Sequence, residues 1–141
     1  MQNRAYTTPL SVMLCLLGIL HVSSIFSQTQ WIGPANGDWF TSANWNNGLP
    51  AAGKDALIGG GNSVVIGGPL TIAGFNVNSF GSISLTAALD NQGTFDSSGP
   101  FAVSGGGSVV NKGTLRNFST MSFAGTASLT NEAGALFSNS V

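Results

Sequence analysis

The chain has 141 residues, a formal net charge of −1, 6% charged residues and 20 glycines. Its only histidine, His21, and its only cysteine, Cys15, both lie in the first 27 residues. Residues 28–141 therefore have no Cys/His zinc set, no disulfide framework and no histidine base for a nucleophilic triad. They also carry too few basic residues to neutralise phosphates, so we expect no nucleic-acid partner.

Residues 1–27 have the order of an export signal. Arg4 precedes an apolar run from Leu10 to Leu20, and small and polar residues follow as far as Ser27. This order is typical of a signal peptide, which we expect to be cleaved after Ser27, with cleavage after Ser24 as the alternative. The run is shorter than the roughly 20 apolar residues of a membrane-spanning helix, so an anchor is the less favoured interpretation. We expect a secreted or cell-surface protein whose mature chain has no membrane span.

A segment rich in tryptophan and glycine, residues 28–62, follows the signal. It contains Trp31, Trp39 and Trp45 among several glycines and prolines. The first coil of a repeat structure exposes strand edges and an open core, and large aromatic rings cover such an end because each buries about 150–250 Å². We interpret the segment as an N-terminal cap. The alternative is a carbohydrate contact, in which Trp31, Trp39 and Trp45 are exposed and stack on sugar rings.

The remaining chain, residues 63–141, has a period of about twenty residues. Rows of twenty written from residue 89 align residues of like character: Leu89, Val109 and Leu129; Asn91, Asn111 and Asn131; Phe95 and Leu115; Phe101 and Met121; Val103 and Phe123. We also align Phe75 with Phe95, Ile83 with Val103, and Leu136 with Leu115 after a one-residue insertion. A fixed period of this length indicates a solenoid.

The alternation of apolar residues identifies the kind of solenoid. Phe101 and Val103, like Met121 and Phe123, are separated by one residue, which is the period of a β-strand. We therefore predict an all-β chain: a parallel β-solenoid of the right-handed β-helix type, with about 20 residues per coil. The aligned apolar residues face inward, so replacing Phe95 or Phe123 by aspartate is expected to collapse the stack. The aligned asparagines form either a ladder of side-chain amides or a row of turn residues.

One stretch resembles a known group of proteins. GDWFTSANWNNGLPAAGKDALI, followed by short Val/Ile strands and rows of the type N-x-G-T, is similar to the start of bacterial secreted β-helix proteins, which include autotransporter passenger domains and filamentous adhesins. The resemblance covers residues 31–141. Because these proteins are typically much longer, it implies that the chain is the N-terminal part of a larger surface or secreted protein. It also implies an adhesive role, with surface glycans or a host or cell-surface protein as partner.

Few residues of the mature chain suit catalysis. It has five carboxylates, and none of them forms an Asp-x-Asp pair or a calcium-binding nonapeptide. We therefore expect no catalytic, cofactor-binding or metal-binding residue, and an exported, non-catalytic structural or adhesive β-solenoid. The alternatives are a carbohydrate-binding module, or a fragment of a β-helix enzyme acting on polysaccharides, in which two carboxylates converge in space. A fragment with no independent function is a third interpretation.

Overall fold

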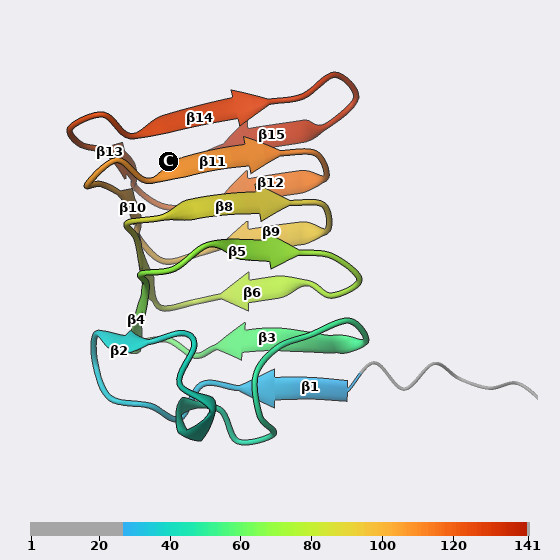
Figure 1. The fold of residues 1–141 in the computed structure, drawn as a ribbon, viewed down its shortest axis with the longest axis vertical. Helices are drawn as coiled ribbons and strands as arrows, with labels where there is room; N and C mark the ends of the chain where they lie inside the picture. Colours follow the sequence, from blue (N-terminus) through green and yellow to red (C-terminus); the bar gives the residue numbers. More distant parts are fainter. Residues whose placement is uncertain (1–26, 141) are drawn as a thin grey trace, which may run out of the picture.

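The computed structural model of the chain describes residues 27–140, so the predicted signal lies outside the described residues except for Ser27. Regular structure in this range is almost entirely β, with one short 3-10 turn, η1 (Ser42–Asn44). The strands are stacked as successive coils, from β1 at one end of the molecule to β14 and β15 at the other (Figure 1). The predicted all-β class is confirmed.

The coils build three sheets, in which every pairing between the strands is parallel. The first sheet contains β1 (Ser27–Gln30), β3 (Lys54–Ile58), β6 (Val77–Ser79), β9 (Thr94–Ser97), β12 (Thr114–Asn117) and β15 (Leu136–Asn139). The second contains β2 (Gly37–Asp38), β4 (Ser63–Ile66), β7 (Ser82–Leu85), β10 (Phe101–Val103) and β13 (Met121–Phe123). The third contains β5 (Leu70–Ile72), β8 (Ala88–Asn91), β11 (Ser108–Asn111) and β14 (Ser128–Asn131). This arrangement is the predicted parallel β-solenoid.

Alternate residues of each strand point into the space between the sheets. In β9 the side chains of Phe95 and Ser97 are buried while their neighbours are partly exposed, and β12 repeats this pattern with Leu115 and Asn117. The buried apolar side chains of all three sheets form one continuous cluster, which the three tryptophans join. Each coil adds apolar surface to a shared core, and hydrogen bonds between neighbouring coils satisfy the backbone.

The register of the later coils agrees with the twenty-residue rows. Val109 pairs with Leu89 on one side and with Leu129 on the other, and Leu115 pairs with Phe95. Asn111 lies between Asn91 and Asn131. The fixed period therefore locates the strands of these coils correctly.

Three other alignments are wrong. Phe95 pairs with Val77, eighteen residues earlier, rather than with Phe75. Val103 pairs with Leu85 rather than with Ile83, whose partner is Phe101. Leu115 pairs with Phe137 rather than with Leu136. The physical reason is that corners change length from coil to coil, whereas paired strands keep their register because a shift by one residue turns every side chain to the other face.

One corner requires glycine because successive coils approach closely there. A Cβ on Gly113 would collide with the carbonyl oxygen of Gly93 in the coil below. A Cβ on Gly93 would lie 2.5 Å from the carbonyl oxygen of Phe75, which is closer than real Cβ atoms come. The aligned Gly-Thr pairs of the rows therefore mark a corner where backbone packs directly on backbone.

The two ends of the stack differ from the middle. Pairing begins at β1, so the segment 28–62 contributes strands of the first coils as well as the tryptophans. At the other end β13 is the outermost strand of the second sheet, and Phe123 is 42% exposed. The expectation that Phe123 is a buried core residue is therefore wrong. Among residues 27–140, no helix is long and apolar enough to cross a membrane.

Candidate functional site

The three tryptophans lie together in the N-terminal part of the core. The indole of Trp45 packs edge-to-face against both others, with ring centroids 5.2 Å from Trp31 and 4.8 Å from Trp39. Trp45 Nε1 donates a 2.8 Å hydrogen bond to the carbonyl oxygen of Trp39. A short antiparallel bridge joins the backbones of Trp31 and Trp45. Aromatic rings prefer this edge-to-face contact, which holds the first coil against the core.

Burial decides between the two interpretations of these residues. Trp31, Trp39 and Trp45 are only 2%, 1% and 3% exposed. A sugar ring needs an open indole face to stack on, and in this structure none of the three offers one. The placement of these residues therefore does not support the alternative of a carbohydrate contact, and their contacts are those of core residues.

The hydrogen bond of Trp45 allows a matched test of this cluster. We expect Trp45→Phe to lower the free energy of unfolding by about 1–2 kcal/mol more than Trp31→Phe does, because Trp45 Nε1 has a partner to lose. Within residues 27–140, Trp31 Nε1 is buried and has no hydrogen-bond partner. Urea unfolding of both variants measures the difference. Equal losses would show that the Trp45 hydrogen bond contributes nothing.

A ladder of asparagine side chains runs through the third sheet. Asn91 Nδ2 donates to Asn111 Oδ1, and Asn111 Nδ2 donates to Asn131 Oδ1, each over 2.7 Å. The same Nδ2 groups also donate to the carbonyl oxygens of Thr114 and Leu136, over 2.8 Å in each case. Of the two interpretations left open by the sequence, the ladder is therefore the observed one. It ties each coil to the next through the buried side chains of Asn91 and Asn111 and, at its last step, the exposed side chain of Asn131.

The sequence rows did not identify a second buried polar column. It lies in the first sheet, where Ser79 pairs with Ser97, Ser97 with Asn117, and Asn117 with Asn139. The side chains of Ser79 and Ser97 donate to the carbonyl oxygens of Gly81 and Gly99, two residues ahead. Asn117 Nδ2 donates to Ser119 in the same way and also to Asn139 Oδ1. The twenty-residue spacing of Ser97 and Asn117 was the signal that could have identified this column.

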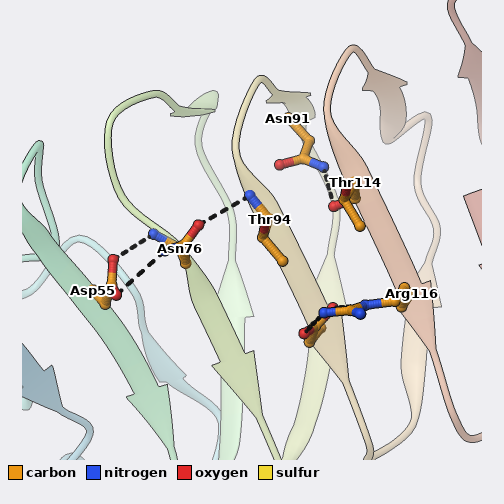
Figure 2. Close-up of polar contacts among 7 residues, drawn as sticks. Asp55, Asn76, Asn91, Thr94, Thr114 and Arg116 are labelled. Atoms are coloured by element: carbon orange, nitrogen blue, oxygen red, sulfur yellow. Dashed lines mark hydrogen bonds and ion pairs between the residues drawn. The ribbon is translucent and has the colours of Figure 1, made fainter. Parts of the chain in front are cut away.

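Two ion pairs link successive coils on the outside of the rod. Arg116 lies directly above Asp96 and binds its carboxylate through two nitrogens, with Nε to Oδ1 at 2.7 Å (Figure 2). Lys112 Nζ lies 3.0 Å from Asp90 Oδ2. The hydrogen bond from Gln92, with a smaller contribution from Lys112, lowers the pKa of Asp90, while partial burial opposes the shift. The Asp96 carboxylate raises the pKa of Arg116.

A third inter-coil contact runs across the first sheet. The Asp55 carboxylate accepts a 2.7 Å hydrogen bond from the backbone nitrogen of Asn76 and a 3.3 Å bond from its side chain (Figure 2). Asn76 Oδ1 accepts a 3.2 Å bond from the backbone nitrogen of Thr94 in the next coil. Asp38 instead accepts bonds from Phe40 and Thr41 within its own turn. All four aspartates of the described chain are therefore engaged in local or inter-coil bonds.

The polar contacts of the described residues join one coil to the next. Within residues 27–140, no three His, Cys, Asp or Glu side chains gather closely enough to hold a metal ion. Lys112 pairs with Asp90 and Arg116 with Asp96 in the neighbouring coil, and the amides of Asn91 and Asn111 bond to the next asparagine and to the backbone. These ion pairs and hydrogen bonds hold each coil in register with the previous one.

Comparison with known proteins identifies no relative. No protein-family model, no curated protein and no solved structure matches the chain.

Proposed function

We propose that the chain is an exported, non-catalytic β-solenoid that acts as a stiff spacer and contact surface outside the cell. In this proposal it is the N-terminal part of an adhesin-like or autotransporter-like bacterial surface protein. The observation that carries the proposal is the continuity of inter-coil bonding. A core, two buried polar columns and two outer ion pairs all run along the same axis.

This combination suits a spacer for a physical reason. Bending a stack of coils opens the gap between neighbouring rungs on one side, which strains backbone ladders and side-chain ladders together. The buried amides make such opening costly because each would lose its partner inside the core. The inter-coil contacts therefore support a rod that is stiff along its axis. The export pattern of residues 1–27 supports a location outside the cytoplasm.

Export can be tested by mass spectrometry. We expect the full chain, expressed in a bacterium with a C-terminal epitope, to be recovered outside the cytoplasm with Gln28 as its first residue. Leu16→Arg with Leu17→Arg breaks the apolar run and should retain the product inside with its leader uncut. Leu16→Ile with Leu17→Ile preserves the run and serves as the control. An uncleaved product in the cytoplasm would refute the proposed location.

Adhesion and catalysis are tested separately, by binding to the immobilised protein and by the release of reducing ends from polysaccharides. The immobilised protein should retain cells or glycans above the level of an unfolded variant of the same chain, and it should release no reducing ends from polysaccharides. Release of reducing ends would favour the polysaccharide-acting alternative. Export without retention of any cell or glycan would remove the adhesive half of the proposal and leave the spacer.

A further inference from the structure

At one corner of the rod, every second coil carries a large, exposed apolar side chain. We call the position of each coil at this corner a level. The corner follows the strands of the first sheet, and the residue after each strand continues the inter-coil ladder. The backbone nitrogens of Phe80, Ser98, Phe118 and Ser140 each donate to the coil below. Phe80 and Phe118 are 59% and 52% exposed, and they are separated by the level of Ser98. Below Phe80 lies the level of Gly59, Gly60 and Gly61.

We call this column the corner ridge: the glycine level (59–61), Phe80, Ser98, Phe118 and Ser140. Its two large side chains are two coils apart, or about 9.6 Å at the usual spacing of paired strands. Between and beside them lie levels that carry only glycine or serine. Outward positions on the neighbouring strands of the second sheet are small, as at Ser84 and Ala102. Large projections therefore alternate with gaps.

From this alternation we infer that the corner ridge binds the corner ridge of a second copy of the chain, with the two rods antiparallel. A two-fold axis between the levels of Phe80 and Ser98 reverses the order of the levels. Phe80 of each copy then faces the Ser98 gap of the other. Phe118 faces the glycine level, where a Cβ on Gly60 would meet nothing within 4 Å. The projecting side chains of one corner ridge thus fit the gaps of an identical corner ridge, as an interface with two-fold symmetry requires.

The charges beside the ridge agree with the antiparallel arrangement. Asp96 and Arg116 lie on the first sheet two residues before Ser98 and Phe118. In a parallel pair of rods, Asp96 of one chain would lie beside Asp96 of the other, and Arg116 beside Arg116. Each ridge phenylalanine would likewise meet the same phenylalanine of the other chain. In the antiparallel pair, Asp96 comes level with Asn78, and Arg116 comes level with β3, which carries Asp55. Like charges are separated only in the second case.

The size of the contact sets its strength. A phenylalanine side chain offers about 150–250 Å², so each half-exposed ring leaves roughly 100 Å² open. Two rings from each copy bury roughly 400 Å², well below the roughly 1,000 Å² of a stable interface. The association is therefore weak and reversible for free chains. Where many rods are held close together, their high local concentration raises the fraction that is paired, although each single contact stays weak.

Cysteine capture tests the arrangement on full-length chains in which Cys15 is replaced by serine. We expect a mixture of Phe118→Cys and Gly60→Cys chains under mild oxidation to give at least about five times more mixed disulfide than disulfide of either chain with itself. Like positions lie three coils apart in the antiparallel pair, about 14 Å, which no disulfide spans. Adding Phe80→Ser to both chains leaves Phe118 of the Gly60→Cys chain as the only large side chain of the corner ridge in the mixed pair, and this should abolish most of the excess.

Every outcome of this experiment decides the inference. Dominant self-disulfides would overturn it in favour of parallel rods. Capture equal to that of the Phe80→Ser chains would overturn it altogether. Loss of capture on addition of a soluble neutral polysaccharide, with protection of the Phe118→Cys thiol, would assign the ridge to a glycan instead. Circular dichroism of each variant, expected to be unchanged, separates these results from loss of the fold, and none of them depends on whether the chain is exported.

Discussion

Replacing Phe95 by aspartate is expected to prevent folding. Phe95 is fully buried, pairs with Val77 and Leu115 in neighbouring coils, and its ring stacks on Phe101 with centroids 5.1 Å apart. A carboxylate at this position would have no partner in the core and would leave a cavity where the ring was. We expect a loss of more than about 4 kcal/mol, which is comparable with the whole stability of a small domain.

Phe123→Asp provides the matched control for this prediction. The same substitution is made there at a phenylalanine of the second sheet that is 42% exposed, so the new carboxylate stays hydrated. We expect it to cost less than about 1 kcal/mol. Thermal unfolding followed by circular dichroism measures both variants. A cooperative transition retained by the Phe95→Asp chain would show that Phe95 is not part of a continuous core.

Asn111→Ala is expected to have the next largest effect. Asn111 is fully buried and occupies the middle of the asparagine ladder, where it accepts from Asn91 and donates to Asn131 and to the Leu136 carbonyl oxygen. The substitution removes three hydrogen bonds and leaves Asn91 Nδ2 with one of its two acceptors. We expect a loss of about 3 kcal/mol.

Asn131→Ala is the control for the ladder. Asn131 is exposed: it accepts from Asn111 in the coil below and donates to the Ala135 carbonyl oxygen, where water can replace both partners, so its replacement should cost less than about 1 kcal/mol. Chemical denaturation of both variants, compared with the unchanged chain, gives the two values. If the two substitutions cost the same, the ladder would be incidental to stability, and the asparagines would serve only as corner residues.

The sequence predicts the later coils well because their repeats are regular. Leu89, Val109 and Leu129 share a column in the rows and in the sheets, and the same is true of Asn91 and Asn111. The fold class depends on this regularity together with the two-residue alternation within each row. Both patterns are direct consequences of stacking one coil on another, so both can be recognised in the amino-acid sequence.

Other features could not be obtained from a fixed period. The spacing between paired strands varies in the earlier coils, and Val77, not Phe75, lies beside Phe95. Whether Trp39 faces the core or the solvent depends on how the chain turns around η1, and no periodicity describes that turn.

Two surface features were predictable in principle from the rows. Asp96 and Arg116 occupy the same column with opposite charge, which indicates the observed ion pair. Phe118 occupies the column of Ser98, and an apolar residue aligned with a polar one indicates an outward position. Agreement between the rows identifies the core columns, whereas these two features are marked by differences between the rows.

Each later coil is hydrogen-bonded to the coil about twenty residues away, and scalar couplings across hydrogen bonds, measured by NMR on labelled protein, test this directly. We expect couplings from the Phe118 nitrogen to the Ser97 carbonyl carbon, from Lys112 to Asn91, and from Gln92 to Ile72. Couplings that instead joined adjacent strands as antiparallel hairpins would contradict the stacked coils, and with them the proposed rod.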